Sequence, residues 1–144
     1  MRFDPEAFIA DCRTALQGDG AAKHIKELVA RAVAEPRAVC EGLGIPGRAG
    51  IQTLHRSQDL TILNVIWGPM MTIMPHNHQM WAVIGVYSGR EDNIFWRRPA
   101  DIPRGRLEAA SAKALSDKDT VLLGAETIHS VTNPIRRLSG AIHV

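Results

Sequence analysis

The chain has 144 residues, of which 45% are hydrophobic and 22% are charged, a composition typical of one soluble globular domain. The formal net charge is only +2 and the basic residues are scattered, so nothing indicates nucleic-acid binding. No apolar run approaches the ~20 residues of a membrane span, the early charges at the N-terminus do not resemble a secretory signal, and two cysteines form no disulfide framework. We therefore expect a cytoplasmic protein with neither a membrane nor a nucleic-acid partner.

Helical periodicity dominates the first third of the chain. Asp4 and Pro5 form a capping signal that begins a helix, and this helix ends near Gly18. Apolar residues recur at helical spacing from about residue 21 to 35, and a shorter helical piece follows. About 45 residues make a poor core alone. We therefore expect residues 1–46 to be an N-terminal helical cap that packs on the rest of the protein.

Residues 47–144 have a different sequence pattern, in which short runs of residues that favour β-strands are separated by turn residues. The runs predict strands at Ile51–Leu54, Leu60–Trp67, Met70–Met74, Trp81–Tyr87, Ile94–Arg97, Arg106–Ala110, Thr120–Leu123, Ile128–Thr132 and Leu138–Val144. Many short strands at this spacing are typical of a sandwich or barrel. The sequence therefore predicts one structural domain, mainly β, with the helical cap on its outer sheet face.

Three histidines in the β region form a candidate metal site. His76 and His78 are two residues apart, and His129 lies in a later predicted strand. Side chains at i and i+2 of a strand point to the same face, about 6–7 Å apart at Cα, so two imidazoles can converge on one ion. The pair and the third histidine together predict metal binding.

These residues resemble the motifs of the cupin superfamily. His76 and His78 match the H-x-H of its first motif, and His129 with Asn133 matches the H-x-x-x-N that ends its second. The glutamate of the first motif is replaced by Ala82. The resemblance implies a cupin double-stranded β-helix, or jelly roll. We expect Asn133 to fix the turn after its strand rather than to touch substrate.

A first motif without its glutamate resembles the thiol dioxygenase branch of the cupins, which includes cysteine dioxygenase. Arg56 lies where that family carries the arginine that holds the substrate carboxylate, and His143 matches the histidine of its Ser-x-His-x-Tyr segment. Ala141 replaces the serine, and the sequence ends at Val144, one residue before the tyrosine. The resemblance implies Arg56 and His143 as catalytic residues beside a metal held by His76, His78 and His129.

The implied cofactor is Fe(II), because zinc has no redox chemistry, although a purified sample can carry Zn or Ni. The implied reaction uses O₂ to oxidise a small cysteine-like thiol acid to its sulfinic acid. The substrate class that we expect is a small thiol or organic acid. Two alternatives stay open: a cupin metalloenzyme of another activity, such as a diketone-cleaving dioxygenase or an isomerase, and a non-catalytic module that binds metal or small molecules. The oligomeric state also stays open, with a homodimer as one option.

Two other groups of acidic residues bear on the site. Glu126 precedes His129 by three residues and would add a carboxylate ligand if its loop curled back. Residues 91–93, with the sequence Glu-Asp-Asn, follow the Gly89 turn, and we expect them to form a solvated hairpin end.

Overall fold

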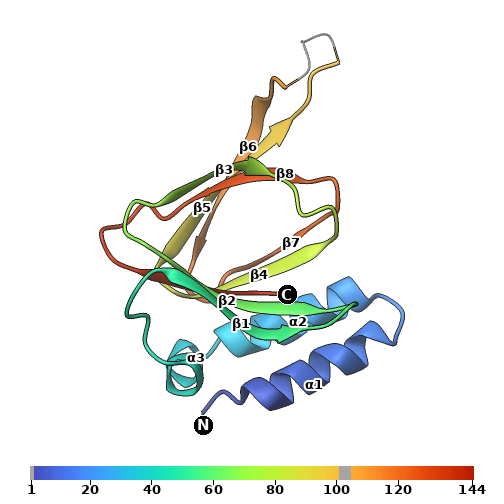
Figure 1. The fold of residues 1–144 in the computed structure, drawn as a ribbon, viewed down its shortest axis with the longest axis vertical. Helices are drawn as coiled ribbons and strands as arrows, with labels where there is room; N and C mark the ends of the chain where they lie inside the picture. The colour runs from blue at the N-terminus through green and yellow to red at the C-terminus, as the bar shows by residue number, and fades with distance from the viewer. Residues whose placement is uncertain (1, 101–104) are drawn as a thin grey trace.

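The computed structural model describes residues 2–100 and 105–144, in which two β-sheets face each other and three helices lie outside one of them (Figure 1). The helices are α1 (Pro5–Leu16), α2 (Ala21–Val33) and α3 (Pro36–Leu43). The strands are β1 (Gly50–Arg56), β2 (Thr61–Trp67), β3 (Thr72–His76), β4 (Ala82–Ser88), β5 (Arg90–Arg97), β6 (Glu108–Ser116), β7 (Thr120–Leu123), β8 (Ile128–Thr132) and β9 (Ser139–His143). The prediction of a mainly β fold with N-terminal helices is confirmed.

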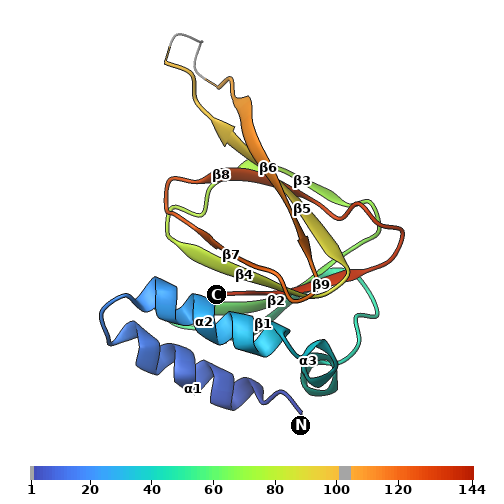
Figure 2. The same cartoon turned by 180° about the vertical axis from the view of Figure 1, so that it is seen from behind.

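The strands form a five-stranded sheet in the order β1-β2-β9-β4-β7 and a four-stranded sheet in the order β3-β8-β5-β6. All of the pairings are antiparallel, and strands far apart in sequence become neighbours, such as β9 between β2 and β4. This double-sheet arrangement is consistent with a jelly roll. The β5–β6 hairpin extends beyond the sandwich (Figure 2). Strand β6 continues to Ser116, six residues past the predicted end of its strand, because it pairs with β5 back to Arg90, the first residue of β5.

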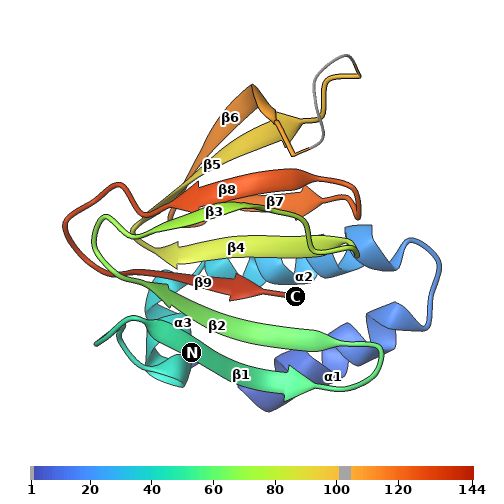
Figure 3. The ribbon, with the colours of Figure 1, turned by 45° about the horizontal axis from the view of Figure 1, so that its top comes forward.

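The helices cover the outer face of the five-stranded sheet, with α2 against β4 and β7 and α1 against α2 (Figure 3). Helix α1 begins as predicted, because the Asp4 carboxylate accepts hydrogen bonds from the backbone N–H groups of Glu6 and Ala7. Gly85 of β4 permits the close approach of α2, since a Cβ there would lie 2.4 Å from Cγ1 of Val29. None of the helices in the described ranges is long and apolar enough to cross a membrane.

Alternate residues of the five-stranded sheet belong to different cores. Ile62, Val83 and Ile142 pack with the helices, whereas Val65 and Ala141 pack in the space between the two sheets. Strand β4 is therefore buried on both faces and is apolar almost throughout. Each large apolar side chain fully buried in this way contributes about 1.5–3 kcal/mol, and the shared sheet fixes where side chains enter the interior.

Candidate metal centre

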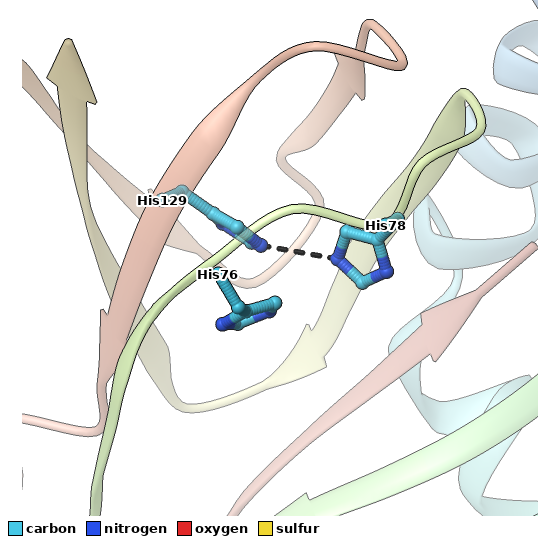
Figure 4. A group of neighbouring side chains, drawn as sticks. All are labelled: His76, His78 and His129. Atoms are coloured by element: carbon cyan, nitrogen blue, oxygen red, sulfur yellow. Dashed lines mark hydrogen bonds between the residues drawn. The ribbon is translucent and has the colours of Figure 1, made fainter. Parts of the chain in front are cut away.

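Three histidine side chains converge between the sheets. His76 ends β3 and pairs in register with His129 of β8, while His78 lies just beyond the end of β3. One nitrogen from each ring lies within 4.8 Å of the other two, and the Nε2 atoms of His78 and His129 are 3.1 Å apart (Figure 4). The expectation that the H-x-H pair shares one strand is wrong, because β3 ends at His76. The chain then bends, and the two rings still converge.

The spacing of these nitrogens fits a bound metal ion. With nitrogen–metal distances of about 2.0–2.1 Å, two ligands at right angles to each other lie about 3.0 Å apart. The 3.1 Å between the Nε2 atoms of His78 and His129 is close to that value. A tetrahedral arrangement with the same bond lengths would place the two nitrogens about 3.3–3.4 Å apart, so the observed spacing lies between the two geometries. It suits two ligands of one ion, and three protein ligands leave one or more positions for other molecules.

Hydrogen bonds orient two of the rings. Nδ1 of His129 lies 2.9 Å from Oδ1 of Asn93, and Nδ1 of His76 lies 2.8 Å from the carbonyl oxygen of Met74. Both partner oxygens can only accept, so each Nδ1 must carry the hydrogen and donate it. This tautomer leaves the Nε2 lone pair of each ring free for a metal ion, which is the usual arrangement behind a histidine ligand.

Burial favours the neutral form of two of the three histidines, His129 and His78. It lowers the pKa of His129 to about 4, with further lowering from His76, His78 and His143 that outweighs the opposite effect of Glu91. Burial also lowers the pKa of His78, again reinforced by His76 and His143. Metal ions bind the neutral imidazole, so burial holds His78 and His129 in the form that binds a metal.

The cluster borders a cavity of about 410 Å³ whose walls are mostly apolar. Besides His76, His78 and His129, its lining residues are Ile51, Leu63, Val65, Trp67, Ile73, Met74, Pro75, Val131 and His143. A second cavity of about 390 Å³ shares His78, His143 and Leu63 with the first. No lysine or arginine lines either cavity within the described part of the chain, so this space suits a molecule with an apolar body.

His143 lines this cavity, and the buried carboxylate of Glu91 lies behind it; the catalytic role that the family resemblance implies for His143 stays a prediction. Glu91 is 0% exposed, and its Oε1 lies 3.8 Å from Nε2 of His143. Asn93, also buried, donates from Nδ2 to Oε2 of Glu91 at 3.4 Å. The expectation of a solvated hairpin end at residues 91–93 is therefore wrong for these two, which face the interior from β5. Only Asp92, between them, is partly exposed and pairs with Arg90.

The other predicted site residues lie elsewhere. Arg56 is exposed at the end of β1 and lines neither cavity, so its predicted contact with a substrate carboxylate stays a prediction that its position does not support. Glu126 is exposed, and the cluster of possible metal ligands found among the described residues contains histidines alone. Asn133 has the expected role, because its Nδ2 donates to backbone carbonyl oxygens of Trp67, Gly68 and Arg137.

Comparison with known proteins identifies the fold. No family profile matches the chain, and no curated protein matches it in sequence. Among solved structures, BH2720 of Bacillus halodurans has a TM-score of 0.57 at 17% identity, over 78% of this chain and 74% of that one. A cupin superfamily protein of Desulfitobacterium hafniense has a TM-score of 0.52 at 10% identity, over 69% and 77%.

The cupin domain of Schizosaccharomyces pombe Cnp3 is also similar, with a TM-score of 0.53 at 6% identity over 67% of this chain and 61% of that one. At such low identity these similarities concern the fold alone. They show that the predicted cupin architecture is correct. The assignment to the thiol dioxygenase branch rests on the sequence motifs and is not decided by these structures.

Proposed function

We propose that this chain, which has the cupin fold and a cluster of three histidines, is an Fe(II)-dependent dioxygenase that oxidises a small thiol. The observation that carries the proposal is the convergence of three histidine side chains on one point beside a mostly apolar cavity. His76, His78 and His129 would hold the metal, and the hydrogen bonds to Asn93 and to Met74 already orient two of them.

The ligand set favours an anionic substrate. Three neutral donors leave the charge of a divalent ion uncompensated, so an acidic group is favoured in the open positions as its anion, and metal coordination deprotonates a thiol outright. Bound iron would supply the O₂ chemistry that zinc cannot. The overall reaction adds both oxygen atoms of one O₂ to the sulfur of RSH and yields the sulfinic acid RSO₂H.

The cavity walls select the rest of the substrate. The aliphatic and aromatic side chains of the cavity would pack against an uncharged body, whereas a carboxylate would meet no cationic side chain there. We therefore rank a thiol with an uncharged body above the thiol acid that the sequence resemblance implies. Arg56, which would have held the carboxylate, is exposed outside the cavity.

The same lining supports a second candidate function, oxidative cleavage of a 1,3-diketone. The enolate of such a molecule is an anion that offers two oxygens to a metal, and the remainder of the molecule is apolar. It would use the same three histidines and the same apolar walls. The two candidates differ in the atom that binds the metal, which makes them separable by experiment.

The test is an oxygen-uptake screen on metal-free protein reloaded with Fe(II) under anaerobic conditions. The panel contains a thiol acid, an uncharged thiol of similar size and a 1,3-diketone, and His129→Ala serves as the control. We expect uptake of one O₂ per thiol with sulfinate as product, fastest for the uncharged thiol, and none with the control. Turnover of the diketone alone would establish the second candidate, and no uptake with any of the three would refute the proposed oxygenase.

A further inference from the structure

Glu91 and His143 form a buried pair that neither the fold nor the metal cluster requires. Oε1 of Glu91 and Nε2 of His143 are both fully buried, and neither has a hydrogen-bond partner among the described residues. The two atoms face each other at 3.8 Å. A buried carboxylate is costly unless it is paired. Each atom is therefore the partner that the other lacks, and an approach of about 1 Å would complete a hydrogen bond.

The pair determines which nitrogen of His143 can meet a substrate. A carboxylate oxygen only accepts, so Nε2 carries the hydrogen and the lone pair of the neutral ring lies on Nδ1. Nε2 is the fully buried nitrogen, and the ring lines both cavities that adjoin His78. Nδ1 is therefore the atom that a molecule bound at the metal cluster can reach.

A second contact connects this pair to the metal cluster. The amide of Asn93 donates to Oε2 of Glu91 from Nδ2 and accepts from Nδ1 of His129 at Oδ1. One buried amide thus holds the carboxylate behind His143 and orients a metal ligand. All of these side chains come from the adjacent strands β5 and β8 and from β9 of the facing sheet.

From this geometry we propose that His143 accepts the acidic hydrogen of the substrate at Nδ1 and that Glu91 is the positioning residue that keeps Nδ1 free to do so. The inference rests on the proposed function in one respect, namely that the substrate has such a hydrogen. The step is a proton transfer: the bond from hydrogen to sulfur breaks, its electron pair stays on sulfur, and the proton moves to Nδ1. The imidazolium that forms faces the Glu91 carboxylate, which offsets its charge.

The tautomer of His143 is the first test, and it requires no metal. Long-range ¹H–¹⁵N spectra of the metal-free protein above pH 7 distinguish a ring protonated on Nε2 from one protonated on Nδ1. We expect Nε2–H in the parent and in Asp92→Asn, which removes the neighbouring carboxylate on the partly exposed face of β5. Glu91→Leu should give a mixture or Nδ1–H, and an unchanged Nε2–H in that variant would overturn the role of Glu91. Glu91→Met removes the carboxylate and keeps most of the length of the side chain, so it serves if the leucine variant does not fold.

The second test follows the proton. Anaerobic titration calorimetry of Zn(II)-loaded protein with 2-mercaptoethanol, in two buffers of different ionisation enthalpy, gives the number of protons released per thiol bound. We expect the parent to retain a large part of the proton and His143→Gln to release close to one per thiol, with affinity lower by about 10-fold or more. Equal release by the parent and His143→Gln would refute the proton acceptor.

These tests separate the two proposals. If the parent binds thiol but consumes no O₂, the proposed oxygenase fails while the proton count still decides the role of His143. If the parent oxidises thiols but the tautomer is insensitive to Glu91, the oxygenase stands and the positioning role of Glu91 is wrong.

Discussion

The hydrogen bond between Asn93 and His129 offers the sharpest test of the metal site, because Asn93 touches a ligand without being one. In Asn93→Ala, Nδ1 of His129 loses its only hydrogen-bond partner among the described residues, and the ring is free to turn or to change tautomer. Loss of such a partner typically weakens metal binding by about 10- to 100-fold, or roughly 1.4–2.7 kcal/mol. The ligand count is unchanged, so binding should weaken without being abolished.

A matched control separates this effect from general destabilisation. Asn64 is also buried and accepts a 2.7 Å hydrogen bond from the Tyr87 hydroxyl, but it lies on the face of the sheet that the helices cover. Asn64→Ala should therefore cost a similar free energy of unfolding, about 1–3 kcal/mol, and leave metal affinity within twofold of the parent. The assay is competition with a chelator for Zn(II) or Co(II). Equal affinities in the two variants would refute the argument that Asn93 orients His129.

Three further predictions follow from the site and the cap. Replacing His76, His78 or His129 by Ala should remove most of the bound metal, measured by elemental analysis, with an unchanged β-type circular dichroism spectrum. The free energy of unfolding of the metal-free protein, measured by urea denaturation, should fall by up to about 3 kcal/mol as the pH is lowered from 6.5 to 4. The reason is that His129 takes up a proton near pH 6.5 in the unfolded chain, whereas in the folded chain its pKa is about 4. Equal urea midpoints at pH 6.5 and pH 4 would contradict this prediction. Gly85→Val should cost about 1–3 kcal/mol through overpacking against α2, seen as a lower Tm, whereas Gly47→Ala, which meets nothing closer than 3.9 Å, should not.

The secondary-structure elements and the grouping of three histidines were predictable because each has a local signal. Period-two alternation and turn residues marked the strands, and capping chemistry marked the start of α1. His76, His78 and His129 stood out because two histidines at a spacing of two follow a predicted strand and a third lies in a later predicted strand, a pattern that indicates a ligand set. Even there the local rule gave the wrong detail, since the bend after β3, and not a shared strand, brings the ring of His78 to the others.

The residues behind the ligands could not be found in this way. Glu91 and Asn93 follow a turn and are polar, which locally indicates solvent exposure. Their burial depends on the position of β5 between β8 and β6 in the sheet. Strands β5 and β8 are more than thirty residues apart in the sequence, so no local pattern predicts that they pair. One local feature did indicate burial. Glu91 and Asn93 are two residues apart, so on a strand both lie on the same face as Phe95, which packs against a buried core. Arg56 is the opposite case, a residue predicted to face the interior that is exposed. Its position in the family pattern suggested contact with a substrate, but it lies at the end of the edge strand β1, where its side chain is exposed.

The helices bear on the chemistry although they do not touch the metal cluster. Ile142 is fully buried in the core that the sheet shares with the helices, and His143, the next residue, faces the opposite side, since successive side chains of a strand alternate. A rotation of the β9 backbone that reoriented His143 would therefore also move Ile142 out of its core. Packing against the helices fixes the backbone of β9, from which His143 approaches Glu91. Gly140, also on β9, lies so close to Tyr87 of β4 that a Cβ at Gly140 would come within 2.6 Å of the tyrosine ring. Two polar groups that lie 3.8 Å apart between the sheets keep their orientation only if the surrounding structure holds them. The helices therefore contribute to the geometry of the site indirectly, through the backbone of β9.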